Sequence, residues 1–194
     1  MDTGDTPQLA AGLYLVATPI GNLGDISKRA IEILNSCDRI ACEHVRTSGK
    51  LLRHLQIHKP LISYHEHNER EIAGKLADAI QKAASVALLS DAGTPTISDP
   101  GFRVVRECHR RGLRVSPLPG PSAALAALSA SGLPSDAFSF VGFLPAKSAA
   151  RIKYFEGITS ASTSQIVFES NKRNQKFLND LLEILGPHLS LIHI

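Results

Sequence analysis

Short apolar segments alternate with amphipathic ones along most of this chain, and this alternation most strongly limits its possible folds. Within residues 26–36, for example, Ala30, Ile31, Ile33 and Leu34 recur at the spacing of one helix face, and Asp25 is expected to cap the first turn. Strands are expected at residues 13–17, 39–42, 61–64, 86–89, 114–117, 138–143 and 165–168. Helices are expected at residues 26–36, 47–55, 69–84, 102–111, 122–131, 148–155 and 173–185. This order predicts an α/β protein with a mostly parallel sheet.

A domain boundary is predicted near residue 134, because Gly132 ends a helix and Pro134 prevents its resumption. The sequence therefore predicts an N-terminal α/β domain at residues 12–134 and a partial second α/β domain at residues 135–188. The strand–helix units of the second domain are too few to cover both faces of a sheet. Residues 1–11 are expected to form a disordered lead-in. Residues 189–194, "LSLIHI", match one reading frame of a common transposon-derived sequencing adapter and are expected to be a non-native tail.

The composition excludes membrane-spanning and exported proteins from the expected classes. The 194 residues are 43% hydrophobic and 20% charged, which is typical of a globular protein with a core. Apolar runs stay short of the ~20 residues that cross a bilayer, and the N-terminal stretch lacks the pattern of a signal peptide. We therefore expect no membrane partner. The cysteines, Cys37, Cys42 and Cys108, form no CxxC pair and indicate buried thiols in a reducing cytoplasm.

Turn-forming residues are concentrated in three segments that follow predicted strands: "ATPIGNLGD", "SDAGTPTISDPG" and "PLPGPSA". In a parallel sheet these segments lie at the carboxyl ends of strands, where open α/β folds bind ligands. The segments contain no Lys or Arg, and they lack the P-loop and dinucleotide motifs, which argues against a polyphosphate ligand. Asp25, Asp91 and Asp99 instead suit a nucleoside or a positively charged centre, such as S-adenosylmethionine. Tight turns without a ligand are the alternative.

Two further features have both a functional and a structural interpretation. The segment "YHEHNERE" contains possible metal ligands, but it is not HExxH, and Asn68 with Glu71 predicts a capping box instead. No metal is therefore predicted. Basic residues cluster in "RVVRECHRRGLR" and again near residues 147–153 and 172–176. They could bind nucleic-acid phosphates or form solvated helix faces.

Several motifs together resemble the tetrapyrrole-methylase superfamily and, within it, the bacterial ribose methyltransferases of small-subunit ribosomal RNA. The motifs are "LYLVATPIGNLGDIS", "YHEHNE", "LLSDAGTPTISDPG", "PLPGPSAALAALSASGLPSD" and "GFLPAKSAAR". The resemblance covers about residues 12–188. It implies two α/β domains with S-adenosylmethionine in a cleft between them, a homodimer in the full-length protein, and 2′-O-methylation of a cytidine in 16S rRNA within the small ribosomal subunit.

The resemblance also assigns site residues by motif. Gly93-Thr94-Pro95 stands in place of the superfamily's Gly-Asp-Pro turn. The residues implied to contact the cofactor are Pro19, Ile20, Gly21, Asn22, Gly93, Thr94, Pro95, Ile97, Pro119, Gly120, Ser122, Ala123 and Phe168. Those expected to contact RNA are Arg46, Lys147, Arg151, Lys172 and Arg173. The chain departs from the family where Glu43-His44-Val45-Arg46 replaces Glu-Asp-Thr-Arg.

The expected reaction is methyl transfer to a ribose 2′-oxygen, which a general base would assist by removing the hydroxyl proton. Glu43, His44, Asp91, Asp99 and Glu169 are the candidates for this base, and the sequence does not choose among them. Two other functions remain open at this point. One is methylation of a corrin or porphyrin on the same fold, and the other is a non-catalytic remnant that binds the cofactor or RNA.

Overall fold

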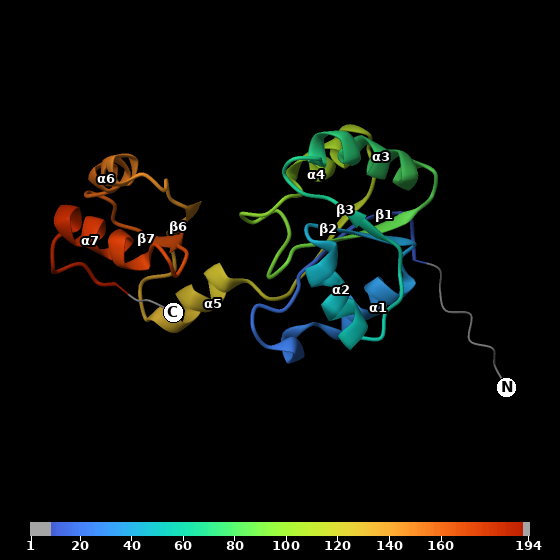
Figure 1. The fold of residues 1–194 in the computed structure, drawn as a ribbon, viewed down its shortest axis with the longest axis horizontal. Coiled ribbons are helices and arrows are strands. Elements are labelled where there is room, and N and C mark those ends of the chain that lie inside the picture. Colours follow the sequence, from blue (N-terminus) through green and yellow to red (C-terminus); the bar gives the residue numbers. More distant parts are fainter. Residues whose placement is uncertain (1–8, 192–194) are drawn as a thin grey trace. The chain divides into compact units, whose positions relative to one another are not determined.

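The structure is a computed structural model that describes residues 9–191 of the chain (Figure 1). It divides into two compact units, with the boundary between Ser122 and Ala123. We call residues up to Ser122 unit 1 and those from Ala123 unit 2. The sequence places the boundary after the helix at residues 123–131, whereas the structure places it before that helix. Most of the expected N-terminal lead-in and half of the expected C-terminal tail lie outside the described residues.

A five-stranded parallel sheet forms the centre of unit 1, as the alternation of elements predicts. Its order is β3-β2-β4-β1-β5. The strands are β1 (Gly12–Val16), β2 (Arg39–Cys42), β3 (Leu61–Ser63), β4 (Ser85–Leu89) and β5 (Val115–Leu118). In register, Val16 of β1 pairs with Leu89 of β4 and Leu118 of β5. These strands therefore end at the same edge of the sheet, and the segments after β1, β4 and β5 leave from that edge.

Helices cover both faces of this sheet (Figure 1). The helices are α1 (Lys28–Ser36), α2 (Val45–His54), α3 (Glu69–Gln81) and α4 (Phe102–Arg110). Leu34 of α1 and Leu52 of α2 belong to the core on one face, while Leu76 of α3 and Val104 of α4 belong to the core on the other. Because helices lie on both faces, all of central β4 is buried, which explains its continuous apolar run.

Local details in unit 1 confirm one expectation and correct another. Cys37, Cys42 and Cys108 are fully buried, and burial raises the pKa of each thiol, for Cys108 to about 11. The prediction of buried thiols is therefore confirmed.

The helix cap predicted at Asp25 is wrong. Ser27 caps α1, and its hydroxyl accepts a hydrogen bond from the backbone N–H of Ala30 at 3.1 Å. Asp25 lies in the short 3₁₀ helix η1 (Leu23–Asp25).

Unit 2 contains α5 (Ala123–Ser131), β6 (Phe138–Phe143), α6 (Ser148–Gly157), β7 (Ser164–Phe168) and α7 (Asn174–Leu185). The two strands are parallel, with a register shift between Phe140 and Gly142. Leu128 of α5 packs against Ile166 of β7, which explains why this helix belongs to unit 2. A second apolar cluster joins α6 and α7. Among residues 9–191, the helices are all too short or too polar to cross a membrane.

Candidate functional site

The three predicted loops of unit 1 are joined to one another at the carboxyl edge of the sheet. The backbone N–H of Thr18, after β1, donates to the carbonyl of Gly93 at 2.9 Å, and Gly93 N–H donates back at 3.0 Å. The Thr94 hydroxyl donates to the carbonyl of Pro121, after β5, at 3.0 Å. Segments about 100 residues apart in the chain therefore form one surface, as expected from a parallel sheet.

Close backbone approach explains the glycines in these loops. A Cβ atom on Gly120 would lie 2.8 Å from the Cβ of Ala17. A Cβ atom on Gly101 would lie 2.7 Å from the Thr96 side chain and 2.9 Å from that of Leu88. Gly93 adopts φ +85°, a conformation that is strained for other residues. The glycines therefore keep the loops close to the ends of the strands.

The loop after β4 also contains backbone strain that the sequence does not reveal. Thr96 (φ 74°) and Ser98 (φ 61°) both lie in the left-handed region, which is rare for a β-branched residue such as threonine. Such conformations cost about 1–3 kcal/mol each and are concentrated at functional sites. Ile97, which lies between these two residues, has a side chain that is 43% exposed. Ile20, in the loop after β1, is 36% exposed. The loop after β4 is therefore strained, and it exposes an apolar side chain, as does the adjoining loop after β1.

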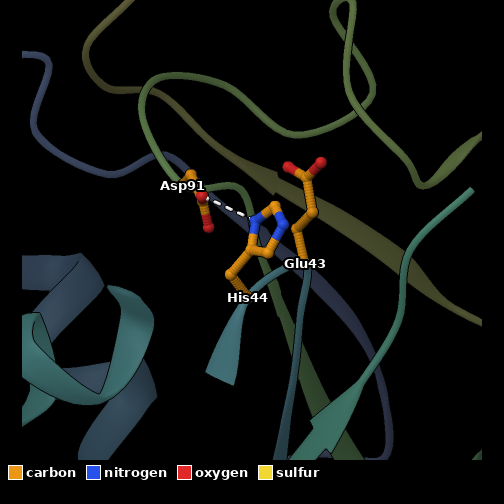
Figure 2. Close-up of side chains that lie close together, drawn as sticks. All are labelled: Glu43, His44 and Asp91. Carbon is orange, nitrogen blue, oxygen red and sulfur yellow. Dashed lines mark hydrogen bonds and ion pairs between the residues drawn. The ribbon is translucent and has the colours of Figure 1, made fainter. Parts of the chain in front are cut away.

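Ionisable side chains gather beside these loops, at the ends of β2 and β4. His44 Nδ1 lies 2.8 Å from Asp91 Oδ2 (Figure 2). Burial raises the pKa of Glu43, and the negative charges of Asp99 and Asp91 raise it further. Burial also raises the pKa of Asp99. Within residues 9–191, no Lys or Arg forms an ion pair with Glu43, Asp91 or Asp99. The candidate base residues of unit 1 thus form one cluster with excess negative charge.

The same cluster has a spacing at which a cation could bind. One ligand atom from each of Glu43, His44 and Asp91 lies within 4.8 Å of the others. The second oxygen of Asp91, Oδ1, is buried and accepts no hydrogen bond from the part of the chain described. His44 already satisfies Oδ2 of the same carboxylate, so the arrangement also suits a histidine oriented by an acid.

The "YHEHNERE" segment, after β3, has a more structural role than its residue types suggest. The Tyr64 side chain is buried, and its hydroxyl accepts a hydrogen bond from the backbone N–H of Val104 at 3.2 Å. The predicted capping box is wrong, although Asn68 does precede the first residue of α3. Its amide oxygen accepts from the N–H of His65 at 2.9 Å, and its amide nitrogen donates to the Ser63 carbonyl at 3.0 Å. Asn68 therefore fixes the turn before α3.

In unit 2, the candidate residues Phe168 and Glu169 are held by their neighbours. The Phe168 ring packs edge-on against Phe140, with ring centroids 5.0 Å apart. Glu169 Oε1 lies 2.7 Å from the Arg173 guanidinium and accepts a hydrogen bond from the N–H of Ser170 at 2.7 Å. Its other oxygen, Oε2, is buried without a partner in the described structure. Of the base candidates, Glu169 alone is paired with an arginine within residues 9–191.

The prediction that Arg151 contacts RNA is wrong. Its side chain is fully buried, and its guanidinium forms an ion pair with Asp180 of α7, with Nε 2.8 Å from Oδ2. The Ser148 hydroxyl donates to the same carboxylate at 2.6 Å. Sequence alone could not reveal this pair, because its members come from different helices. Arg151 therefore joins α6 to α7.

The remaining predicted RNA contacts differ in accessibility. Arg46, Lys147 and Lys172 are exposed, whereas Arg173 is half-buried in its ion pair with Glu169. The arginine-rich segment of α4 is largely neutralised within unit 1. Arg103 pairs with Glu69, Arg110 with Glu107, and Arg111 with both Glu107 and Asp78. Arg103 and Arg111 therefore join α4 to α3, and Arg110 pairs within its own helix.

The predicted cofactor contacts also fall into groups. Pro19, Ile20, Gly21 and Asn22 follow β1, while Gly93, Thr94, Pro95 and Ile97 follow β4. Pro119, Gly120 and Ser122 follow β5 in unit 1, but Ala123 begins α5 in unit 2. Sequence reasoning missed Thr18, whose backbone joins two loops and whose hydroxyl donates to the Ser90 carbonyl at 3.2 Å. Its place directly before the first proline-rich turn was the available signal.

Comparison with known proteins supplies a family and a fold. Residues 12–193 match the family described as tetrapyrrole (corrin/porphyrin) methylases. The protein named ribosomal RNA small subunit methyltransferase I of Vibrio cholerae is 51% identical over 191 residues, covering 98% of this chain and 66% of that protein. Its namesake in Escherichia coli O157:H7 is 49% identical over 174 residues, covering 90% of this chain and 61% of that protein. The chain thus spans about two thirds of the length of these relatives.

Two solved structures share the architecture at lower identity. A uroporphyrin-III-C-methyltransferase from Thermus thermophilus aligns with a TM-score of 0.53 at 22% identity, covering 72% of this chain and 61% of that one. A diphthine synthase aligns with a TM-score of 0.67 at 14% identity, covering 88% of this chain and 70% of that one. The predicted fold class is therefore confirmed.

Proposed function

Because this chain belongs to the tetrapyrrole (corrin/porphyrin) methylase family, we propose that it is the greater part of a methyltransferase that acts on small-subunit ribosomal RNA. Relatives of about 50% identity over nearly the whole chain bear that name. The structural observation that carries the proposal is the edge of the unit 1 sheet, where three loops without lysine or arginine meet beside carboxylates that no lysine or arginine of residues 9–191 pairs with.

The proposed methyl donor is S-adenosylmethionine, and the residues at this edge fit it. When bound, it supplies an electrophilic methyl group on a sulfonium. Gly93, with φ +85°, and Gly120, packed closely against Ala17, let the loops adopt the shape that would present their backbone to a ligand. The exposed side chains of Ile20 and Ile97 suit the apolar parts of a nucleoside. The carboxylates of Asp91 and Asp99 suit a positive charge, whereas they would repel a polyphosphate.

His44 is the proposed general base, with Asp91 as its positioning residue. The Asp91 carboxylate holds Nδ1 of the ring at 2.8 Å, which leaves Nε2 to accept the proton of a ribose hydroxyl. Histidine suits this role because it exchanges protons near neutral pH. Glu43 lies beside this pair. Burial raises the pKa of Glu43, so its carboxylate is harder to ionise than that of an exposed glutamate. Glu169 is a weaker candidate, because Arg173 already pairs with its carboxylate.

The proposed acceptor is the 2′-oxygen of a cytidine ribose in 16S rRNA, presented by the small ribosomal subunit in the cytoplasm. In-line displacement at a methyl group mainly requires orientation of the two reactants and exclusion of water. We also propose that the full-length protein is a homodimer. The acceptor atom and the dimer both rest on the resemblance to the family's ribose methyltransferases.

A labelled-methyl assay tests this proposal directly. The chain is incubated with S-adenosylmethionine and small subunits from a strain that lacks the corresponding methylation. Transfer of label to rRNA, located to one ribose by digestion and mass spectrometry, is the expected result. His44→Ala and Asp91→Asn are assayed beside Glu43→Gln and Glu169→Gln. If none of the four lowers the rate more than about tenfold, the base assignment fails and positioning alone accounts for transfer.

The alternatives are distinguished by the acceptor that receives the label. Labelling of a corrin or porphyrin, with unlabelled rRNA, would assign the chain to tetrapyrrole methylation. That function is suggested by the family's description and the uroporphyrin enzyme's fold, although an identity of 22% carries no information on substrate. Calorimetric binding of S-adenosylmethionine without labelling of either acceptor would instead indicate a non-catalytic remnant.

A further inference from the structure

Helix α2 carries a stripe of basic side chains along one face. Arg46, Lys50 and Arg53 are all on the solvent side of the helix, and their spacing of four and three residues places them on the same face. Ser48 and Leu52, on the opposite side, are buried against the sheet. With a rise of 1.5 Å per residue, the stripe extends over about 10 Å. We call Arg46, Lys50 and Arg53 the α2 stripe.

The charges of the α2 stripe are not neutralised by the fold. The helix contains no Asp or Glu, and no ion pair involves these three side chains among residues 9–191. In and directly after α4, by contrast, Arg103, Arg110 and Arg111 pair with acidic side chains, and Arg106 is the one arginine of α4 without an ion pair among residues 9–191. The helix dipole favours Arg53, which lies in the last turn of α2, but it disfavours Arg46, which lies in the first turn. Stability of the helix therefore does not explain the stripe as a whole.

The stripe begins at the candidate site and ends at a basic pocket. His44 is the N-cap residue of α2, so the base candidate lies two residues before Arg46. At the other end, Arg53, His58 and Lys59 line a pocket of about 420 Å³ whose lining includes no carboxylate. The nearby Asp38 carboxylate accepts hydrogen bonds from the backbone N–H and the hydroxyl of Ser85, each at 2.7 Å. These hydrogen bonds are the main cause of its lowered pKa, and the positive charge of Lys59 lowers that pKa further. Basic side chains thus recur from Arg46 to Lys59 on one side of unit 1.

We propose that the α2 stripe and the pocket bind the phosphate backbone of the RNA substrate and lead the strand toward His44. This assignment rests on the proposed function and adds the surface that holds its acceptor. Arginine and lysine side chains neutralise phosphates through charge-assisted hydrogen bonds, without reading the sequence. The cations of the α2 stripe would fix the position of the RNA backbone relative to His44. The residues around His44 would then select the nucleotide that is methylated.

The test compares two variants that lose the same charge from opposite faces of unit 1. Arg46→Gln/Lys50→Gln/Arg53→Gln removes the stripe, and Arg70→Gln/Lys75→Gln/Lys82→Gln removes three charges on or next to α3, whose core lies on the other face of the sheet. Binding to unmethylated small subunits and to a fluorescent single-stranded RNA is measured at several salt concentrations. Each phosphate contact to a single strand adds about 0.7 to the slope of log K against log salt. The stripe variant should therefore lose roughly 2 from that slope.

The outcomes separate this proposal from the proposed function. Tenfold or greater loss of RNA affinity in the stripe variant, with S-adenosylmethionine binding unchanged and the α3 variant near wild type, supports the assignment. If wild-type protein binds and methylates subunits but the two variants behave alike, the surface is wrongly assigned and the function stands. If wild-type protein neither binds nor methylates them, both fail. Loss of binding to anionic phospholipid vesicles, with RNA binding intact, would assign the stripe to a lipid surface and overturn the proposal.

Discussion

In unit 1 the carboxylates of Glu43, Asp91 and Asp99 gather at one sheet edge, whereas in unit 2 the carboxylate of Asp180 is enclosed by its partners. Burial raises the pKa of Glu43 and of Asp99. The Ser148 hydroxyl and then the Arg151 guanidinium lower the pKa of Asp180. A carboxylate with a lowered pKa stabilises the fold when ionised, and one with a raised pKa destabilises it. Unit 2 thus uses its buried acid for packing, while unit 1 keeps acids that a bound cation would satisfy.

The largest expected effect is on the stability of unit 2. Replacing Asp180 with Ala leaves the fully buried Arg151 without its partner, and breaking a buried pair in this way costs about 3–5 kcal/mol. Amide hydrogen exchange of α6 and α7, followed by mass spectrometry, should show this loss while the strands of unit 1 stay protected. The matched control is Glu183→Ala, an exposed acid on the same helix, with an expected change within about 0.5 kcal/mol. Equal exchange in both variants would contradict a structural role for the pair.

The next effect concerns catalysis in unit 1. His44→Ala should lower the rate of methyl transfer about 10²-fold, because it removes the proposed base. Asp91→Asn should lower the rate and change its pH dependence, because the ring loses the carboxylate that orients it at 2.8 Å. The measurement is the single-turnover rate across about pH 5–8, where histidine ordinarily changes charge. His109→Ala, an exposed histidine on α4, serves as the control. Equal pH profiles in the wild-type protein and the His44→Ala variant would refute the assignment.

Much of unit 1 could be predicted because its elements are set by local sequence. The expected strand at residues 39–42 matches β2, and β4 differs from expectation by one residue, since apolar runs mark buried parallel strands. The meeting of three loops followed from the direction of the strands alone. Strain at Thr96 and Ser98 could not be predicted, because threonine and serine carry no signal for a positive φ.

Unit 2 shows the limit of the same reasoning. An arginine in a basic segment indicates an exposed phosphate contact, yet Arg151 is buried because Asp180 reaches it from another helix. In unit 1, likewise, Glu71 has the spacing of a capping box, but it pairs with Lys75 one turn along α3. Charge patterns report which groups are present, whereas their partners depend on how helices pack.

A smaller effect tests whether the loops of unit 1 need glycine. Gly120→Ala should destabilise unit 1 by about 1–3 kcal/mol, because the new methyl group would lie 2.8 Å from the Ala17 Cβ. It should also weaken binding of S-adenosylmethionine, measured by calorimetry. Gly74→Ala is the control, because nothing lies within 4 Å of the position that its Cβ would take. Alanine in the middle of a helix should raise the free energy of unfolding by about 0.5–1 kcal/mol. If both variants are equally stable, close approach of the two loops is not what requires glycine.

The smallest expected effect tests the contrast between Asp99 of unit 1 and Asp180 of unit 2, because the stability that each acid contributes depends on pH. Asp99 has a raised pKa in the folded state, so its ionisation destabilises the fold as pH rises above its ordinary value of 3.8. Asp99→Asn should therefore stabilise unit 1 at pH 7 by roughly 0.5–2 kcal/mol, and the gain should vanish near about pH 3. Asp180→Asn should have the opposite sign at pH 7, because that acid has a lowered pKa. Hydrogen exchange of each unit at both pH values measures the two changes.

A gain in stability from Asp99→Asn has functional meaning only if binding is lost with it. The same variant should therefore bind S-adenosylmethionine more weakly by calorimetry, because the uncharged amide no longer attracts a sulfonium. Stabilisation without loss of affinity would mean that Asp99 serves neither the fold nor this ligand. Destabilisation would mean that its carboxylate has partners in solution that hold it as Asp180 is held. Either result would contradict the proposal that the acids at the sheet edge of unit 1 bind a ligand, whereas Asp180 of unit 2 stabilises the packing of its helices.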